Sequence, residues 1–268
     1  MGGVADTSAG DLLSTVICDL VADIRDGREP ALADAPDAVH RLRTSVRRLR
    51  NVLAGFERYV ERRPARELRG HLASYGTLLG AGRDLEVRAE DCRRVLAALG
   101  RTDLEPTLVE PLLAAHDGAH AVLVAWHGSP DAVALDHLLA TWGEEVPVTD
   151  RARRRADRVR ARVLRRELER VLDRAAVGEA SHDVRKAARR LRHVAEAVGA
   201  ADLARAGKDV QGRLGDHRDA LLLARYLWSA GAPAVVVAQV EAGASRALEG
   251  LPGDLAVLRS LDGATDES

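Results

Sequence analysis

Two copies of one cationic motif, His-x2-Arg-x3-Arg-x2-Arg, lie 142 residues apart and are the side chains of this sequence best suited to bind an anion. On an α-helix, offsets of 0, 3, 7 and 10 residues fall on one face, so each copy predicts a positively charged stripe. A guanidinium group donates two parallel hydrogen bonds to a phosphate, which favours phosphate as the ligand. The stripes consist of His40, Arg43, Arg47, Arg50, His182, Arg185, Arg189 and Arg192.

Apolar residues accompany the first stripe at helical spacing. Leu42, Val46, Leu49 and Leu53 form a neighbouring face that can anchor the helix to a core. Because the motif recurs in both halves, we expect the two stripes to face a shared anionic ligand. The alternative interpretation is that these arginines are solvated or paired with nearby acids.

Positive charge is concentrated in two segments, although the formal net charge is only -1. Residues 36–70 contain ten arginines against four acids, and residues 151–192 contain sixteen arginines or lysines against six acids. The remaining segments are acidic. Arg158, Arg162 and Arg166 share one face of the second basic segment, so we regard them as possible extensions of the site.

Composition favours helices and excludes several classes of protein. Aromatic residues make up only 3% of the chain, whereas straight-chain residues, which favour helices, are abundant. We find neither a membrane-spanning apolar run nor a secretory signal. Cys18 and Cys92 form neither a disulfide framework nor a zinc motif, so we expect a cytoplasmic protein without membrane contact.

Periodicity, together with glycine and proline positions, predicts a duplicated helical bundle. We expect breaks at Gly80-Ala81-Gly82 and at Gly215, and a hinge between the halves at 143–150. The expected helices are 9–26, 36–60, 64–79, 83–99, 105–126, 131–142, 150–176, 179–198, 201–214, 216–228, 233–248 and 254–261.

Each expected glycine break is followed by an Arg-Asp pair. Arg83 and Arg218 are candidate ligand contacts. Asp84 and Asp219 would repel an anion, so they either orient an arginine or histidine from behind or stabilise a first helical turn. His40 and His182 either bind phosphate as imidazolium or stay neutral near a helix start.

A metal site is not expected. His116 and His120 have the i, i+4 spacing of a metal-binding pair, but the sequence shows no third ligand for them.

The ordered motifs resemble the CHAD family, the conserved histidine α-helical domain. The resemblance rests on His40-Arg41-Leu42-Arg43, Leu79–Asp84, His182–Lys186 and Leu214–Asp219, with the arginines between them. It implies an all-α fold of two pseudo-twofold-related antiparallel helical bundles, forming one compact domain with a basic central surface. We expect this domain over 9–262, with halves 9–146 and 147–262 and flexible tails at 1–8 and 263–268.

The resemblance also implies binding of inorganic polyphosphate and, in some members, association with polyphosphate granules. Many members carry an added triphosphate-tunnel domain with an ExExK strand. Glu167-Leu168-Glu169-Arg170 matches that strand only superficially, so we expect a stand-alone CHAD domain here.

We therefore predict a non-catalytic polyphosphate-binding protein without a cofactor. Sulfate, phosphate or pyrophosphate are expected to fit the same groove. The predicted contacts are His40, Arg43, Arg47, Arg50, Arg83, His182, Arg185, Lys186, Arg189, Arg192 and Arg218, with Arg41, Arg48, Arg158, Arg162, Arg166, Arg190 and His217 as extensions.

Two other functions remain open at this point. The same arginines would attract DNA or RNA, although the basic helices offer almost no aromatic residues for base stacking. A metal-dependent phosphohydrolase would need a metal–carboxylate cluster or an activated nucleophile near the stripes, and the sequence indicates neither.

Overall fold

The part of the chain that the structure describes consists of helices and their connections, as predicted. A computed structural model gives the backbone of residues 7–266 and the side chains of residues 7–262. The elements are α1 (Ala9–Asp26), α2 (Arg28–Leu32), α3 (Ala38–Gly55), α4 (Arg62–Ala98), η1 (Thr102–Leu104), α5 (Glu105–Leu108), α6 (Glu110–Trp126), α7 (Pro130–Glu144), η2 (Asp150–Arg153), α8 (Ala156–Val177), α9 (His182–Ala197), α10 (Ala201–Ser229), α11 (Ala234–Leu248) and α12 (Leu251–Asp266).

The expected tails are shorter in the structure than in the sequence analysis. Ser8 caps α1 in a capping box with Asp11, and α12 continues to Asp266. Residues 1–6 and 267–268 lie outside the described residues, so the expectation of flexible tails applies to a part of the chain of which nothing is described.

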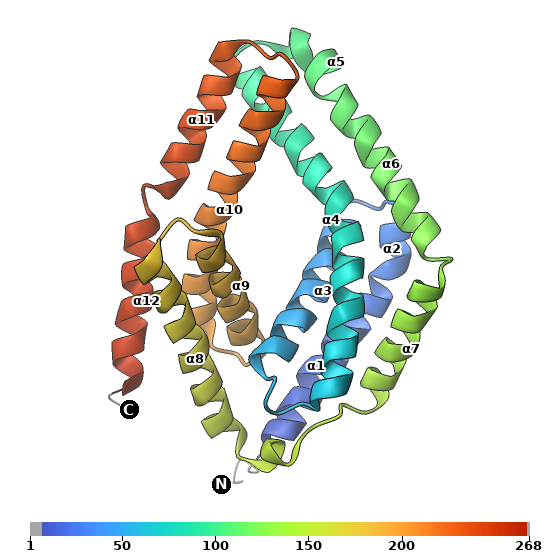
Figure 1. Ribbon diagram of the computed structural model, residues 1–268, viewed down its shortest axis with the longest axis vertical. Coiled ribbons are helices and arrows are strands. Elements are labelled where there is room, and N and C mark those ends of the chain that lie inside the picture. Colours follow the sequence, from blue (N-terminus) through green and yellow to red (C-terminus); the bar gives the residue numbers. More distant parts are fainter. Residues whose placement is uncertain (1–6, 267–268) are drawn as a thin grey trace.

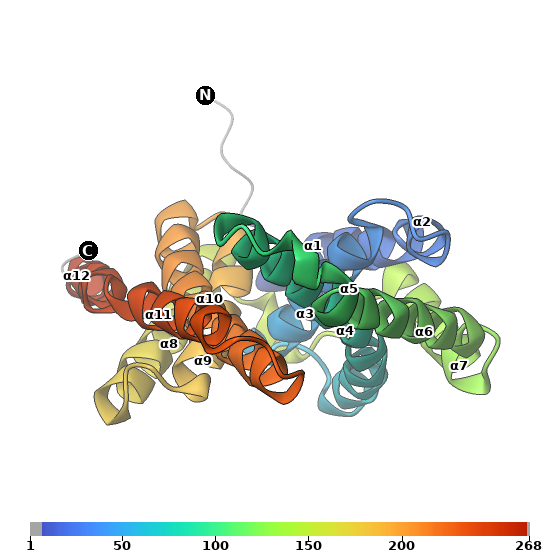
Figure 2. The same cartoon turned by 90° about the horizontal axis from the view of Figure 1, so that it is seen from above.

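The helices form two arms that meet at both ends of the molecule (Figure 1). In the first half α4 packs against α6, and in the second half α10 packs against α11. Seen from above, the far ends of α4 and α10 come together with α11 (Figure 2). Between the arms, α3 packs against α9, so the two predicted stripes lie on neighbouring helices. A twofold rotation between the halves remains a prediction.

Apolar side chains gather in three clusters, and two of these draw on both halves. The largest cluster combines residues of α1, α3, α4 and α7 with Val163 of α8 and Val194 of α9. A second one joins Leu96 of α4 to Leu227 of α10 and Val236 of α11. Burial of apolar surface is the main stabilising contribution in folding, so each half helps to stabilise the other.

The predicted apolar face of α3 is confirmed. Leu42 is 1% exposed, and Val46, Leu49 and Leu53 are 0% exposed. With this face fixed against the core, the neighbouring face with the arginines is directed toward the second half.

Both predicted glycine breaks are wrong. α4 runs without interruption through Gly80-Ala81-Gly82, and α10 runs through Gly215. A glycine inside a helix costs only about 1 kcal/mol relative to alanine, and the packing along these long helices outweighs that cost. The glycines have a different use, which is described with the site below.

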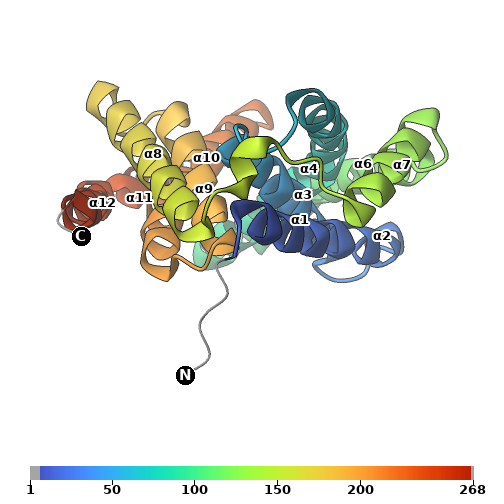
Figure 3. The same ribbon diagram turned by 90° about the horizontal axis from the view of Figure 1, so that it is seen from below.

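The expected hinge is tied down by backbone hydrogen bonds. α3 ends at Gly55 rather than near residue 60, and the segment that follows pairs with residues 147–149. Thr149 N donates to Tyr59 O at 3.0 Å and Glu61 N donates to Pro147 O at 2.7 Å. α8 begins only at Ala156, after η2, because residues 150–153 form a 3₁₀-helix. Figure 3 shows this connection from below.

α3 and α9 approach closely where they cross. A β-carbon at Gly55 would lie 2.5 Å from Val194 Cγ2, a distance that only glycine avoids. Next to this contact, Asn51 Nδ2 donates to His193 Nδ1 at 2.9 Å. Burial lowers the pKa of His193 to about 3, so its ring is neutral and accepts this bond. Asn51 and His193 are also 142 residues apart, like the two motifs.

Two further observations concern the described residues alone. None of their helices has the length and apolar character that a membrane crossing requires. Cys18 and Cys92 are both free thiols.

Candidate functional site

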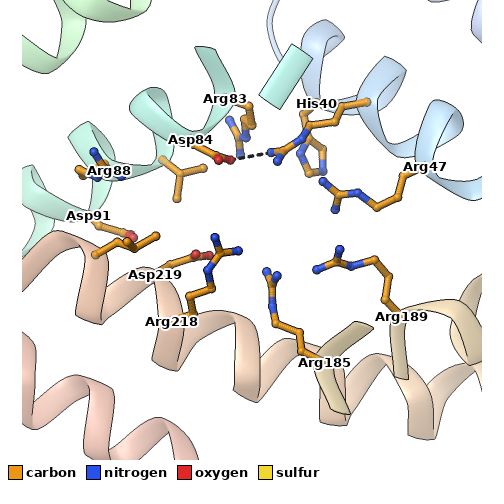
Figure 4. Close-up of a pocket in the computed structure, with 13 residues that line it drawn as sticks. His40, Arg47, Arg83, Asp84, Arg88, Asp91, Arg185, Arg189, Arg218 and Asp219 are labelled. Atoms are coloured by element: carbon orange, nitrogen blue, oxygen red, sulfur yellow. Dashed lines mark hydrogen bonds and ion pairs between the residues drawn. The ribbon is translucent and has the colours of Figure 1, made fainter. Parts of the chain in front are cut away.

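A cavity of about 230 Å³ lies between the two halves and collects most of the predicted contacts (Figure 4). Four helices form its walls: α3 and α4 from the first half, and α9 and α10 from the second. Its lining residues are His40, Arg43, Arg47, Arg83, Asp84, Val87, Arg88, Asp91, Arg185, Arg189, Arg218, Asp219 and Leu222.

Arg47 and Arg189 face each other across one end of the cavity (Figure 4). Neither forms an ion pair with any residue that the structure describes. Burial and then the neighbouring Arg43 lower the pKa of Arg47 to about 10. Burial and then Arg47 lower the pKa of Arg189 to about 9. Both groups stay protonated at neutral pH, so the cavity holds mutually repelling cations that an anion would neutralise.

Arg43 and Arg185 reach the cavity by crossing the two glycines that did not break their helices. A β-carbon at Gly80 would lie 3.2 Å from Arg43 Nη2, and a β-carbon at Gly215 would lie 3.5 Å from Arg185 Nη2. Glycine at these positions therefore leaves room for a guanidinium group to lie against the neighbouring helix. Burial lowers the pKa of Arg185, and its Nε has no hydrogen-bond partner among the described residues.

The opposite end of the cavity is acidic. Asp84, Asp91 and Asp219 gather there, away from Arg47 and Arg189 (Figure 4). Asp84 Oδ1 accepts a hydrogen bond from Arg43 Nη1 at 2.8 Å, which supports the predicted orienting role of Asp84. Burial raises the pKa of Asp219, against the opposing effect of Arg185.

Arg83 and Arg88 belong to the same wall of the cavity but differ in their partners. Arg83 Nη1 lies 2.8 Å from Glu86 Oε2 and 4.0 Å from Asp37 Oδ1, so its charge is already partly balanced. Arg88 lines the cavity one turn beyond Asp84, and we had not predicted it.

Only one of the two motif histidines lines the cavity. His40 does so, and loss of hydration followed by the charge of Arg83 lowers its pKa below the ordinary value, against a smaller opposing effect of Asp37. His182 is exposed at the first turn of α9 and lies outside the cavity. The two histidines therefore differ although their motifs match.

A second hollow of about 460 Å³ adjoins the cavity and shares Arg47 and Arg189 with it. Three predicted contacts, Arg50, Lys186 and Arg190, lie here rather than in the central cavity. Arg69, Arg170 and Arg174 line the same hollow and were not predicted. Burial, followed by the charge of Arg69, lowers the pKa of Arg50.

Several other predicted arginines have structural partners instead. Arg192 Nε and Arg48 Nη2 both bind Glu196, at 2.7 and 2.8 Å. Arg190 Nε donates to Glu167 at 2.5 Å, and Glu167 is 0% exposed. These residues join α3, α8 and α9 to one another.

The remaining predicted extensions are spread over the molecule. Arg166 donates to the carbonyl of Gly55 and to Glu167, so it fastens α8 to the end of α3. His217 Nδ1 donates to Ala244 O at 2.8 Å and faces α11. Arg41 is exposed and lies outside both hollows, and Arg158 and Arg162 line a separate hollow on α8.

His116 and His120 are engaged with their surroundings. His120 Nε2 lies 3.2 Å from Leu32 O, and the ring of His116 packs over Gly82 of α4. Among the described side chains no group of three or more His, Cys, Asp or Glu is arranged to hold a metal ion.

The arrangement of helices around an arginine cavity agrees with comparisons to known proteins. A family model described as the CHAD domain matches residues 15–228. The chain belongs to the CHAD domain family.

Relatives of this CHAD domain occur in Mycobacterium tuberculosis. Uncharacterized protein Rv2226 (strain ATCC 25618 / H37Rv) and uncharacterized protein MT2285 (strain CDC 1551 / Oshkosh) are each 31% identical over 209 residues. The match covers 73% of this chain but only 40% of each relative, so the chain spans less than half of their length.

Two solved structures share the CHAD fold. The CHAD domain from the plant Ricinus communis has a TM-score of 0.71 at 22% identity, covering 98% of this chain and 94% of that one. PptA from Streptomyces chartreusis has a TM-score of 0.69 at 20% identity, covering 98% of this chain and 100% of that one. Both likenesses concern the fold.

Proposed function

We propose that this CHAD domain binds inorganic polyphosphate in the central cavity, without catalysing its conversion. The observation that carries the proposal is the cluster of guanidinium groups that both halves place around one cavity. Arg47, Arg185 and Arg189 form no ion pair with a described residue, and mutual repulsion together with burial lowers the pKa of each. A chain of phosphates supplies the negative charges that such a cluster lacks, and its binding releases condensed counterions.

The chemistry of the lining supports a linear phosphate polymer over a nucleic acid. The cavity is lined by arginine, histidine, aspartate and two aliphatic side chains, Val87 and Leu222. Proteins that bind single-stranded nucleic acids use aromatic platforms for base stacking, and no aromatic residue is part of this lining as described. Arginine forks instead match the phosphate groups themselves.

The lining also supports binding without catalysis. It contributes no hydroxyl or thiol nucleophile among the residues described. Asp84, one of the carboxylates, is held by Arg43 and so is suited to positioning that arginine. We further propose a cytoplasmic protein that associates with polyphosphate granules.

Binding of long-chain polyphosphate to the wild type and to an Arg43→Ala/Arg47→Ala/Arg185→Ala/Arg189→Ala variant tests the proposal. We expect tight binding that the variant loses while circular dichroism shows an unchanged helix content. Single-stranded DNA should compete only at much higher phosphate concentration. Equal binding by the variant, or displacement by DNA at equal phosphate concentration, would overturn the proposal. Release of phosphate with a divalent metal ion would contradict the non-catalytic part.

A further inference from the structure

Arginine-lined hollows continue from the central cavity to the N-terminal end of α8. The second hollow, which shares Arg47 and Arg189 with the cavity, meets a third hollow of about 530 Å³ at Arg69. Arg69 projects from α4, whose Arg62 and Arg66 line the third hollow as well. Because hollows that share a side chain are adjacent in space, these three are continuous.

Two more hollows extend this series. The third hollow shares Arg58 and Arg151 with a fourth, and the fourth shares Arg154 and Arg162 with a fifth on α8. Every junction in the series is therefore formed by at least one arginine. We call the four hollows outside the central cavity the arginine path.

Backbone pairing fixes the middle of the arginine path. Thr149 Oγ1 donates to Arg58 O at 3.0 Å, and Val60 forms a β-bridge with Val148. These bonds hold the connection after α3 against the connection before η2, at the lower end of Figure 1, so Arg58 and Arg151 meet at one hollow. Their proximity follows from the tied connection and was not visible in the sequence.

Charge along the arginine path is largely unbalanced. Arg69, Arg151 and Arg162 form no ion pair with any described residue, and the same holds for Arg58 and Arg154. Off the path, by contrast, Arg153 lies 3.3 Å from Asp150. The carboxylates that line the path are Glu57, Glu61 and Asp183, and all three are exposed to solvent.

We propose that the arginine path binds the continuation of a polyphosphate chain whose first part lies in the central cavity. This inference rests on the proposed function and extends it to a preference for long chains. A flexible polyanion can follow a series of adjacent hollows, and each added phosphate contact raises its affinity through counterion release. Tripolyphosphate, in contrast, fits the cavity but is too short to reach the path.

The lining of the arginine path favours polyphosphate over a nucleic acid. Tyr59 is the aromatic residue that the described hollows contain, and it is 3% exposed. Bases would have no exposed aromatic ring on which to stack, so the path offers contacts to phosphate groups alone.

An Arg151→Gln/Arg162→Gln variant tests the arginine path. Its matched control is Arg63→Gln/Arg160→Gln, which removes the same charge from exposed positions that lie on α4 and α8 outside these hollows. For each protein, the affinity for tripolyphosphate and for long-chain polyphosphate is measured by calorimetry at several salt concentrations. Long single-stranded DNA is measured in parallel.

We expect the path variant to bind tripolyphosphate like the wild type and to bind the long chain roughly tenfold more weakly, with a salt slope reduced by about 1.4–1.8. The control should retain long-chain affinity within about twofold. An equal loss in both variants, or none in the path variant, would overturn the path. A path variant that loses DNA binding but retains long-chain polyphosphate would overturn it too. Failure of wild-type tripolyphosphate binding would instead count against the central cavity, and so against the proposed function.

Discussion

Arg43 of α3 lies across Gly80 of α4, with its Nη2 atom 3.2 Å from the place of a missing β-carbon. Arg185 of α9 repeats this relationship with Gly215 of α10 at 3.5 Å. In both halves a glycine in the middle of a long helix lets a guanidinium group from the motif helix enter the cavity. The glycine and the arginine thus act as one unit of the site.

Filling these two positions should weaken anion binding without unfolding the protein. Gly80→Leu and Gly215→Leu would displace Arg43 and Arg185, and we expect about tenfold weaker polyphosphate binding for each, equal to about 1.4 kcal/mol. Calorimetry measures the affinity, and circular dichroism the helix content.

Gly70→Leu on α4 and Gly212→Leu on α10 are the matched controls, because a β-carbon at either position meets nothing within 4 Å. They should bind like the wild type. Equal losses in the controls and in the two site variants would show that the effect comes from the helix and not from the displaced arginine.

Two neighbouring arginines should respond to the same substitution with opposite changes in stability. Arg189→Met removes a cation repelled by its neighbours, so we expect the ligand-free protein to melt roughly 3 °C higher. Arg190→Met removes the 2.5 Å partner of the buried Glu167, so we expect melting roughly 5 °C lower. Differential scanning calorimetry measures both.

Ligand should then reverse the order for one of them. Polyphosphate should raise the melting temperature of the wild type strongly and that of Arg189→Met much less. If Arg189→Met melts lower than the wild type when both are free of ligand, the arginine cluster is not under repulsion and the electrostatic account of the cavity is wrong.

Binding should depend on pH through His40. Loss of hydration and the charge of Arg83 keep its pKa below the ordinary value in the free protein, against the effect of Asp37, and a bound phosphate would raise it. Affinity should therefore rise as the pH falls from the higher pKa of the complex to the lower pKa of the free protein, by up to about tenfold per unit of difference.

His40→Gln should flatten this dependence between about pH 8 and 5, whereas His182→Gln, outside the cavity, should leave it in place. Calorimetric titrations at several pH values give the affinities. A wild-type affinity that is flat over this range would exclude contact between His40 and the ligand.

Helical spacing in the sequence was enough to predict the two stripes and the apolar face behind the first, because both follow from the period of the helix. It was not enough to assign each arginine a partner. Arg192 has the same place in its motif as Arg50, yet it binds Glu196, since only the packing of α3 against α9 decides which acids are near.

The glycines show the same limit of local sequence. Gly80 and Gly215 have the composition of a break, and tertiary packing makes them passages for guanidinium groups inside continuous helices. Arg88 was detectable, since it lies one turn beyond Asp84 on the same helix face. Arg69 was not, because its approach to Arg50 depends on how α4 packs beside α3.

The affinity for long-chain polyphosphate as a function of salt concentration, for the wild type and for Arg47→Gln/Arg189→Gln, tests the central claim most directly. The Arg63→Gln/Arg160→Gln variant serves as the charge-matched control. If the facing pair Arg47 and Arg189 contacts phosphates, its removal should weaken binding at least tenfold and reduce the slope of log K against log salt by about 1.4–1.8, with the control near the wild type. An unchanged slope in the cavity variant would contradict the account, because the cavity would then not be where the polymer binds.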